Sequence, residues 1–165
     1  MIQKITPWLW FDHEAEEAAS FYVSVFGNSR ILNITHYGEA AASAAGMPKG
    51  SVLTVEFELE GQGFAALNGG SAFTISPAIS FMVSCETQEE IDRLWEKLTE
   101  GGEEVQCGWL TDRFGVSWQI VPAVMIEMMK DKDPERTERA MQAMLTMVKL
   151  DIAALKRAYE GPGTA

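Results

Sequence analysis

Apolar and polar positions repeat one pattern in two halves of the chain. Residues 3–11 form an apolar, strand-like run, and an acidic pair at Glu16 and Glu17 then leads into apolar residues with helical spacing. The same order returns at 78–84, where an apolar run precedes a second acidic pair and a second amphipathic segment. Because each copy joins a strand to a helix, the repeat predicts two related α+β modules.

Further strands are expected after the first helix, which Asp12 is predicted to cap. Alternation and turn residues indicate three strands: 30–37, 52–59 and 64–68. In the second of these, Glu56 and Glu58 share one face, opposite the apolar positions. Gly61–Gly63 is typical of a hairpin turn. The alanine-rich segment 38–50 is predicted to be a loop.

The second copy is shorter, with two or three short strands expected in 103–121 before Pro122. The pattern therefore divides the chain into three parts: a first module at 1–70, a second module at 71–122 and a helical extension at 123–165. Each complete module is a βαβββ unit.

The extension is rich in methionine, with six of the nine methionines between Met125 and Met147. A short helix is expected at 123–130, and Asp133-Pro134 begins a second one. That helix carries an apolar stripe: Met141, Leu145, Val148, Ile152, Leu155 and Tyr159. Such a stripe packs against the core or a second subunit, and a lid over a ligand is the alternative.

Composition narrows the choice of partners. The chain has 165 residues, 47% of them hydrophobic, and a formal net charge of −11. Because a chain this acidic repels nucleic-acid phosphates and anionic lipid surfaces, we expect neither nucleic acid nor a membrane as a partner. Residues 1–5 lack a signal-peptide pattern, and Cys85 and Cys107 form no C-x-x-C pair. We expect a cytoplasmic protein with two reduced thiols.

Three phrases of the sequence resemble a known family. They are Glu16–Tyr22 followed by Phe26-Gly27, Leu67–Gly70, and Gly108–Ile120. Paired modules with these phrases resemble the vicinal oxygen chelate superfamily of glyoxalases, bleomycin-resistance proteins and extradiol dioxygenases. Over residues 3–122 the chain closely resembles one branch, the PhnB-like group, also called the 3-demethylubiquinone-9 3-methyltransferase domain. The resemblance implies a glyoxalase-like α+β fold, in which each module curls into a half-barrel and the halves enclose a pocket.

Active members of the superfamily hold a divalent metal through His or Gln, Glu, His and Glu on four strands. At the corresponding positions this chain offers Pro7, Trp8 or Leu9, then Leu67-Asn68, then Ile79 or Ser80, and finally Gln119. Neutral amides give little charge to hold a divalent cation. We therefore predict no catalytic metal and no other cofactor.

Methyl transfer, which the branch name suggests, usually needs a glycine-rich turn between a strand and a helix of a parallel sheet. The nearest candidate here is Gly61–Gly63, which the pattern places in a hairpin.

Three residues are candidates for catalysis, each with a simpler interpretation. Glu56 could act as a base in a pocket, or lie on a solvated strand face. His36 could exchange protons, or only form hydrogen bonds. Cys107 could be a nucleophile, or an inert thiol.

A ligand is expected to meet aromatic and amide side chains: Trp8, Asn68, Ser80, Trp109 and Gln119. Gln119 is placed on the inner face by the resemblance alone. The predicted function is binding of a small organic molecule without the usual metal. The alternatives are a metal-independent isomerase, lyase or methyltransferase-named enzyme, and a scaffold with a filled barrel. The resemblance and the apolar stripe also suggest a homodimer.

Overall fold

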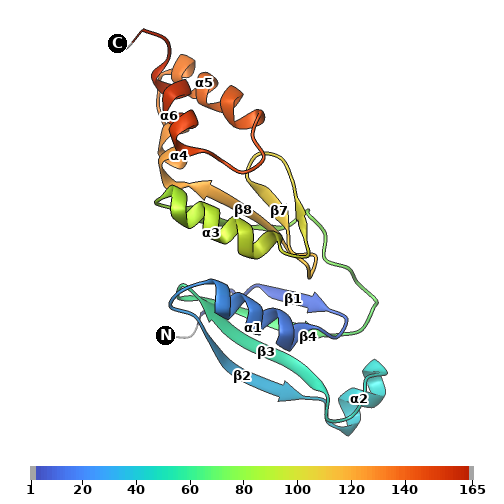
Figure 1. Cartoon of the computed structure of the whole chain (residues 1–165). Helices are drawn as coiled ribbons and strands as arrows, with labels where there is room; N and C mark the ends of the chain where they lie inside the picture. The colour runs from blue at the N-terminus through green and yellow to red at the C-terminus, as the bar shows by residue number, and fades with distance from the viewer. Residues whose placement is uncertain (1–2, 164–165) are drawn as a thin grey trace. The chain divides into compact units, whose positions relative to one another are not determined.

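The first compact unit of the computed structural model ends at Ile75 and the second begins at Ser76, and the structure describes residues 3–163. Within residues 3–75 the first unit holds six elements: β1 (Trp8–Phe11), α1 (Ala15–Val25), β2 (Arg30–His36), α2 (Glu39–Ala45), β3 (Val52–Leu59) and β4 (Gln62–Asn68). Its sheet has the order β1-β4-β3-β2 (Figure 1). β1 runs parallel to β4, and the other neighbours are antiparallel. This is the predicted βαβββ connection.

Helix α1 covers one face of this sheet because alternate residues of the strands are apolar. Phe57 of β3 pairs with Phe64 of β4, and their rings stack with centroids 5.5 Å apart. Tyr22 of α1 lies over Phe57 at 6.3 Å. Val55, Phe57 and Leu59 are buried, as the alternation predicts.

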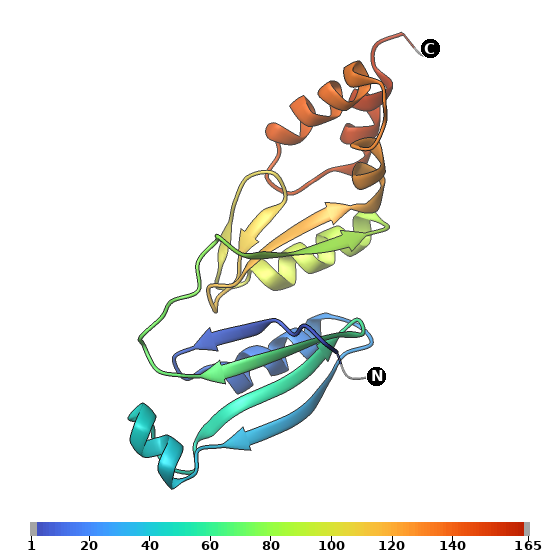
Figure 2. The same ribbon diagram turned by 180° about the vertical axis from the view of Figure 1, so that it is seen from behind.

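The second unit repeats the connection with shorter strands. It contains β5 (Ser80–Cys85), α3 (Gln88–Thr99), β6 (Glu103–Glu104), β7 (Trp109–Thr111) and β8 (Ser117–Pro122). The sheet order is β5-β8-β7-β6, with β5 parallel to β8. Thr87 caps α3, and the helix buries Ile91, Leu94, Trp95 and Leu98. In the reverse view the strands of each sheet lie in front of its long helix (Figure 2). The α+β fold with paired βαβββ units is confirmed.

The helices of the predicted extension belong to this second unit. They are α4 (Ala123–Met128), α5 (Pro134–Leu145) and α6 (Ile152–Glu160), which share a core of Met125, Leu150 and Leu155. The expected continuous stripe helix is wrong, because the chain leaves the helix after Leu145 and a new helix begins after Asp151. The carbonyls of Met147 and Val148 in between accept hydrogen bonds from the backbone of Cys107 and Gly108.

Two local expectations also differ. The segment predicted to be a loop contains α2, which extends past the ends of β2 and β3 (Figure 1). Its run of alanines favours a helix, and Gly46 ends it in a left-handed conformation. Asp12 does not cap α1. The helix begins after Glu14, and the side chain of Asn68 bonds its first turn instead.

Among residues 3–163, no helix is long and apolar enough to cross a bilayer.

Candidate functional site

Each sheet has a second face, opposite its long helix, and we call these the first and second open faces. On the first, the register aligns Trp8 with Ala65 and Trp10 with Leu67. The β3–β4 register continues these rows to Glu56 and Thr54. The first open face is therefore made by Trp8, Trp10, Thr54, Glu56, Ala65 and Leu67. Trp8 is 56% exposed, so it presents its ring on this face.

The segment after β4 crosses Trp10. The indole Nε1 of Trp10 donates a 2.9 Å hydrogen bond to the carbonyl oxygen of Gly70, and Phe73 meets the ring edge-on at 5.0 Å. A methyl group at Gly69 would come within 2.2 Å of the Trp10 ring. Only glycine therefore lets the chain pass so close, and Trp10 is held by this segment.

Asn68 does not share the face of Trp8, because it aligns with Phe11 on the face that α1 covers. It is buried, its Oδ1 accepts a 2.8 Å hydrogen bond from the backbone of Ala15, and its Nδ2 donates to the carbonyl of Val52 at 3.1 Å. The hydroxyl of Tyr37 donates to its backbone carbonyl. The Asn68 side chain therefore holds α1 on the sheet, and we leave it out of the ligand site.

The second open face brings together three of the predicted ligand residues. One row across the sheet is Met82, Gln119 and Trp109, and the next contains Ser80 and Ser117. The Nε2 of Gln119 donates a 2.8 Å hydrogen bond to the hydroxyl of Ser80. Gln119 is thus placed by strand pairing on the face opposite α3.

Trp118 lies on the other face of β8. Its indole donates a 2.9 Å hydrogen bond to Asp112, and its ring packs on Phe81. The tail borders the second open face, because Val121, two residues after Gln119, packs against the cluster of Met125, Leu150 and Leu155.

Met82 and Ser117 also lie on this face, although the sequence motifs did not single them out. Met82 is 54% exposed beside Gln119. Ser117 is buried, and its hydroxyl has no hydrogen-bond partner among the residues that the structure describes. The strand period of two was the available signal, since both lie two positions from predicted site residues, Ser80 and Gln119.

The three catalytic candidates are not gathered in one place. Glu56 is exposed on the first open face. His36 is exposed at the end of the edge strand β2, where it pairs with Val52 rather than Glu56. Cys107 is half-buried in the turn before β7, with a positive φ of 61°, under the tail segment at Met147. Of the three, only Glu56 lies on an open face.

The other thiol is buried in the core. Burial, and then the negative charge of Glu90, raise the pKa of Cys85 to about 12. A thiol that stays protonated at neutral pH is a poor nucleophile and a poor metal ligand.

The donor set of the open faces does not fit a divalent metal. The parallel strand pairs β1–β4 and β5–β8 place Trp8, Trp10, Ala65 and Leu67 on the first face, and Ser80, Met82, Ser117 and Gln119 on the second. None of these side chains is a carboxylate, imidazole or thiolate, the usual donors for such ions. The carboxylates of the first face, Glu56 and Glu58, both come from β3, and the residues aligned with them on β1, β2 and β4 include no histidine or cysteine. Within residues 3–163 no group of three or more His, Cys, Asp or Glu is arranged to hold one.

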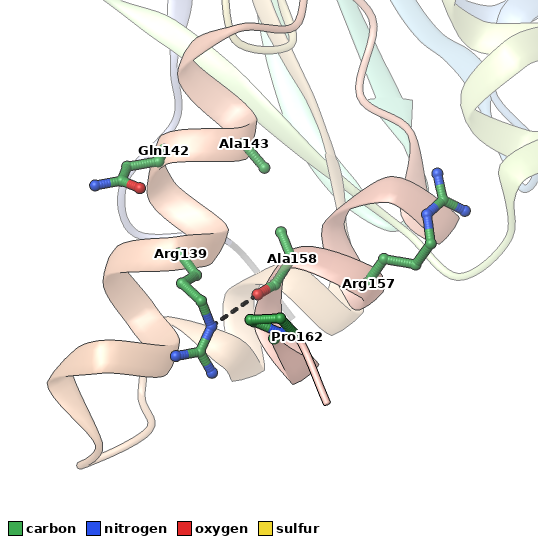
Figure 3. A pocket seen from close by; sticks show the side chains of 7 residues that line it. Arg139, Gln142, Ala143, Arg157, Ala158 and Pro162 are labelled. Atoms are coloured by element: carbon green, nitrogen blue, oxygen red, sulfur yellow. Dashed lines mark hydrogen bonds between the residues drawn. The ribbon is translucent and has the colours of Figure 1, made fainter. Parts of the chain in front are cut away.

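A separate groove of about 380 Å³ lies between α5 and α6, lined by Arg139, Gln142, Ala143, Arg157, Ala158, Gly161 and Pro162 (Figure 3). Arg139 points toward α6 and donates hydrogen bonds to the carbonyls of Ala158 at 3.0 Å and Tyr159 at 2.8 Å. These bonds satisfy the last turn of α6, so the arginine has a structural role. No predicted site residue lines this groove.

Comparisons with known proteins agree with this architecture. A family model described as 3-demethylubiquinone-9 3-methyltransferase matches residues 3–121. The PhnB protein from Bacillus cereus, which carries the same methyltransferase name, is 39% identical, covers 73% of this chain and all of its own, and superposes with a TM-score of 0.66. No curated protein matches.

Two further structures share the fold at lower identity. Protein PA1353 from Pseudomonas aeruginosa is 22% identical, with a TM-score of 0.59 over 73% of this chain and 98% of its own. The fosfomycin resistance protein FosX from Listeria monocytogenes is 14% identical, with a TM-score of 0.55 over 79% of this chain and all of its own. The family match and the shared fold show that this chain belongs to the PhnB-like, 3-demethylubiquinone-9 3-methyltransferase family of the vicinal oxygen chelate superfamily.

Proposed function

We propose that each open face of this chain offers a surface to a small organic molecule, and that on the second face Ser80, Trp109 and Gln119 hold such a molecule without a divalent metal. The observation that carries the proposal is the hydrogen bond from Gln119 to Ser80. It fixes an amide between the side chains of Met82 and Trp109 in one row of the sheet. The amide keeps an acceptor oxygen and one N–H for a ligand.

This combination suits a flat, largely apolar molecule that carries one or two polar groups. Binding sites for such ligands are mostly apolar and aromatic, with a few fixed hydrogen-bonding groups. One FosX structure of this fold is complexed with Mn(II) and a sulfate ion. On the first open face here, the carboxylates of Glu56 and Glu58 lie side by side on one strand, which is too few donors for such an ion, so we expect ligand contacts to come from the protein side chains themselves.

The test is a ligand-observed NMR screen of small neutral, anionic and cationic aromatic compounds, with excess EDTA present. We expect hits that Gln119→Leu and Trp109→Ala weaken. The matched control is Gln142→Leu, which makes the same change at an exposed position in the groove between α5 and α6. If no compound binds, or if Gln142→Leu weakens the hits as much as Gln119→Leu, the proposal fails.

A second function is favoured by the position of Glu56. A carboxylate beside an aromatic ring on a ligand-binding face could take a proton from a bound molecule, which is the step that a metal-independent isomerase or lyase requires. The discriminating measurement is exchange of ligand C–H protons for deuterium in D₂O. If a bound ligand exchanges its C–H protons and Glu56→Gln abolishes this exchange, the protein is an enzyme. If no bound ligand exchanges protons, it is a binding protein.

The name of the family suggests methyl transfer as a third possibility. Here Gly61 lies in the two-residue hairpin between β3 and β4, where its φ is 82°. A hairpin does not form the strand-to-helix turn that cradles a nucleotide-type cofactor. Calorimetric titration with S-adenosylmethionine is therefore expected to give no binding heat, and micromolar binding would revive methyl transfer.

A further inference from the structure

Glu56 and Glu58 lie two positions apart on the same face of β3, yet only one of them has a cation beside it. Arg30, aligned with Glu58 on β2, places its guanidinium 3.8 Å from that carboxylate. The side-chain carboxylate of Glu56 has no hydrogen bond or ion pair with any residue in the described range 3–163. The residue aligned with it on β2 is Asn33, which is neutral. The first open face therefore carries one uncompensated negative charge.

An exposed aromatic ring lies in the same row as this charge. Trp8 aligns with Ala65, and Ala65 aligns with Glu56. Neighbouring strands are about 4.8 Å apart, so the backbones of Trp8 and Glu56 are separated by about 10 Å. Ala65 between them is only 1% exposed, so of these three residues a ligand can reach the exposed side chains of Trp8 and Glu56. The Trp8 ring and the Glu56 carboxylate are thus two exposed groups with one buried alanine between them.

We infer that the row of Trp8, Ala65 and Glu56 is a binding site for the positively charged group of an organic ammonium ligand. A cation that contacts the exposed part of the Trp8 side chain can lie within about 6 Å of the indole ring, where the ring face attracts it. The same cation can pair with the carboxylate on its other side. This inference rests on the proposed function, since it names the ligand chemistry that one open face selects.

The charge of the chain supports this choice over an anionic ligand. A net charge of −11 raises the local concentration of cations and repels anions. A bare metal ion is a poorer fit, because hard divalent cations need several oxygen ligands and Glu56 is the only carboxylate in this row. An organic cation needs one counter-charge and an apolar or aromatic surface, and both are present.

The experiment uses three probes with the same ring and different charges: benzylammonium, benzyl alcohol and benzoate. Each is titrated into the whole protein, and the indole N–H signals of the five tryptophans are followed by ¹H–¹⁵N NMR. Trp8→Phe assigns the Trp8 signal. We expect benzylammonium to shift that signal with an affinity roughly threefold or more above that of the alcohol, and benzoate to be weaker still.

Two charge variants then separate the site from the overall field. Glu56→Gln and Glu58→Gln remove the same charge from the same face of the same strand. Glu56→Gln should reduce the benzylammonium affinity to about that of the alcohol, whereas Glu58→Gln should leave it within about twofold. Equal losses in the two variants would show a general charge effect and would overturn the inference.

The remaining outcomes distinguish this inference from the proposed function. If benzyl alcohol or benzoate binds at Trp8 as tightly as benzylammonium, selection of a cation is wrong while small-molecule binding stands. If none of the three probes shifts the Trp8 signal, the inference is overturned. The proposed function is then decided separately by the hits that depend on Gln119 and Trp109.

Discussion

The side-chain oxygen of Asn68 accepts a hydrogen bond from the backbone of Ala15, so the last residue of β4 holds the first turn of α1. The other end of the same amide bonds Val52. Asn68 stands where the superfamily resemblance places a metal ligand, yet its side chain faces the helix. In this chain the position supports the fold of the first unit.

Asn68→Ala should therefore lower stability without affecting a ligand. This substitution leaves a buried N–H of α1 and the carbonyl of Val52 without their partners. The free energy of unfolding should fall by about 1–3 kcal/mol. Urea unfolding measures this loss. Asn33→Ala is the control, because Asn33 is exposed, and it should change the free energy by less than about 0.5 kcal/mol. Equal effects of the two variants would contradict the capping role.

Gly69→Ala tests the close approach of the chain to Trp10. The added methyl would lie 2.2 Å from the ring, so either the ring or the segment after β4 must move. We expect a loss of about 1–3 kcal/mol in thermal unfolding and a shifted Trp10 indole N–H signal.

The control for this substitution is Gly38→Ala, where an added methyl meets nothing within 4 Å. It should cost less than about 1 kcal/mol and leave the Trp10 signal in place. An unchanged Trp10 signal in Gly69→Ala would show that the segment does not hold the ring.

The two thiols should differ in reactivity. Because burial raises the pKa of Cys85 to about 12, almost none of it is thiolate at mildly basic pH. In the folded protein we expect only Cys107, which is half-buried, to react with Ellman's reagent. Cys107→Ser should remove that reaction, and urea should expose Cys85 to it. Rapid labelling of Cys85 in the folded Cys107→Ser variant would contradict its placement.

The contact between the tail and α3 should depend on pH. Lys149 of the tail lies 2.8 Å from the carboxylate of Asp92, and Gln88 also donates to it. The hydrogen bond from Lys149, and then the one from Gln88, hold the pKa of Asp92 below its ordinary value. The stabilisation is thus present above the ordinary pKa and is lost as pH falls through the lower folded value.

Asp92→Asn should consequently lower Tm at neutral pH by a small amount, since both partners are partly exposed. The difference between wild type and variant should disappear in strong acid, where Asp92 is protonated in both the folded and the unfolded state. Thermal unfolding followed across the acid range measures it, and a Tm difference that does not depend on pH would contradict this assignment.

Much of the fold could be predicted because local patterns and topology agree. The alternation in β3 identified the face that carries Val55 and Phe57, and the glycine pair of residues 61–63 marked the hairpin. The length of this hairpin turn also determines which face of the sheet Asn68 occupies. A two-residue turn aligns Phe57 with Phe64, which puts residues 64, 66 and 68 on the face that α1 covers. Counting along the strand would have placed Asn68 correctly.

Other features depend on contacts between distant segments, which periodicity does not reveal. The tail stripe keeps helical spacing through Val148, yet the chain leaves the helix because Cys107 and Gly108 bind the carbonyls of residues 147 and 148. Gln88 also bonds the carbonyl of Leu150 and the N–H of Ile152. These bonds come from residues about forty or more positions away in the sequence. The Gln119–Ser80 pair likewise required the parallel register of β5 and β8, which the sequence left open.

The most direct test of the central claim is the ¹H–¹⁵N spectrum of the protein with the strongest hit of the NMR screen, recorded in excess EDTA. We predict that the largest shifts occur on the second open face, at Ser80, Met82, Trp109 and the side-chain amide of Gln119. Shifts confined to the groove of Arg139 and Gln142, or shifts that appear only after Mn(II) is added, would contradict it.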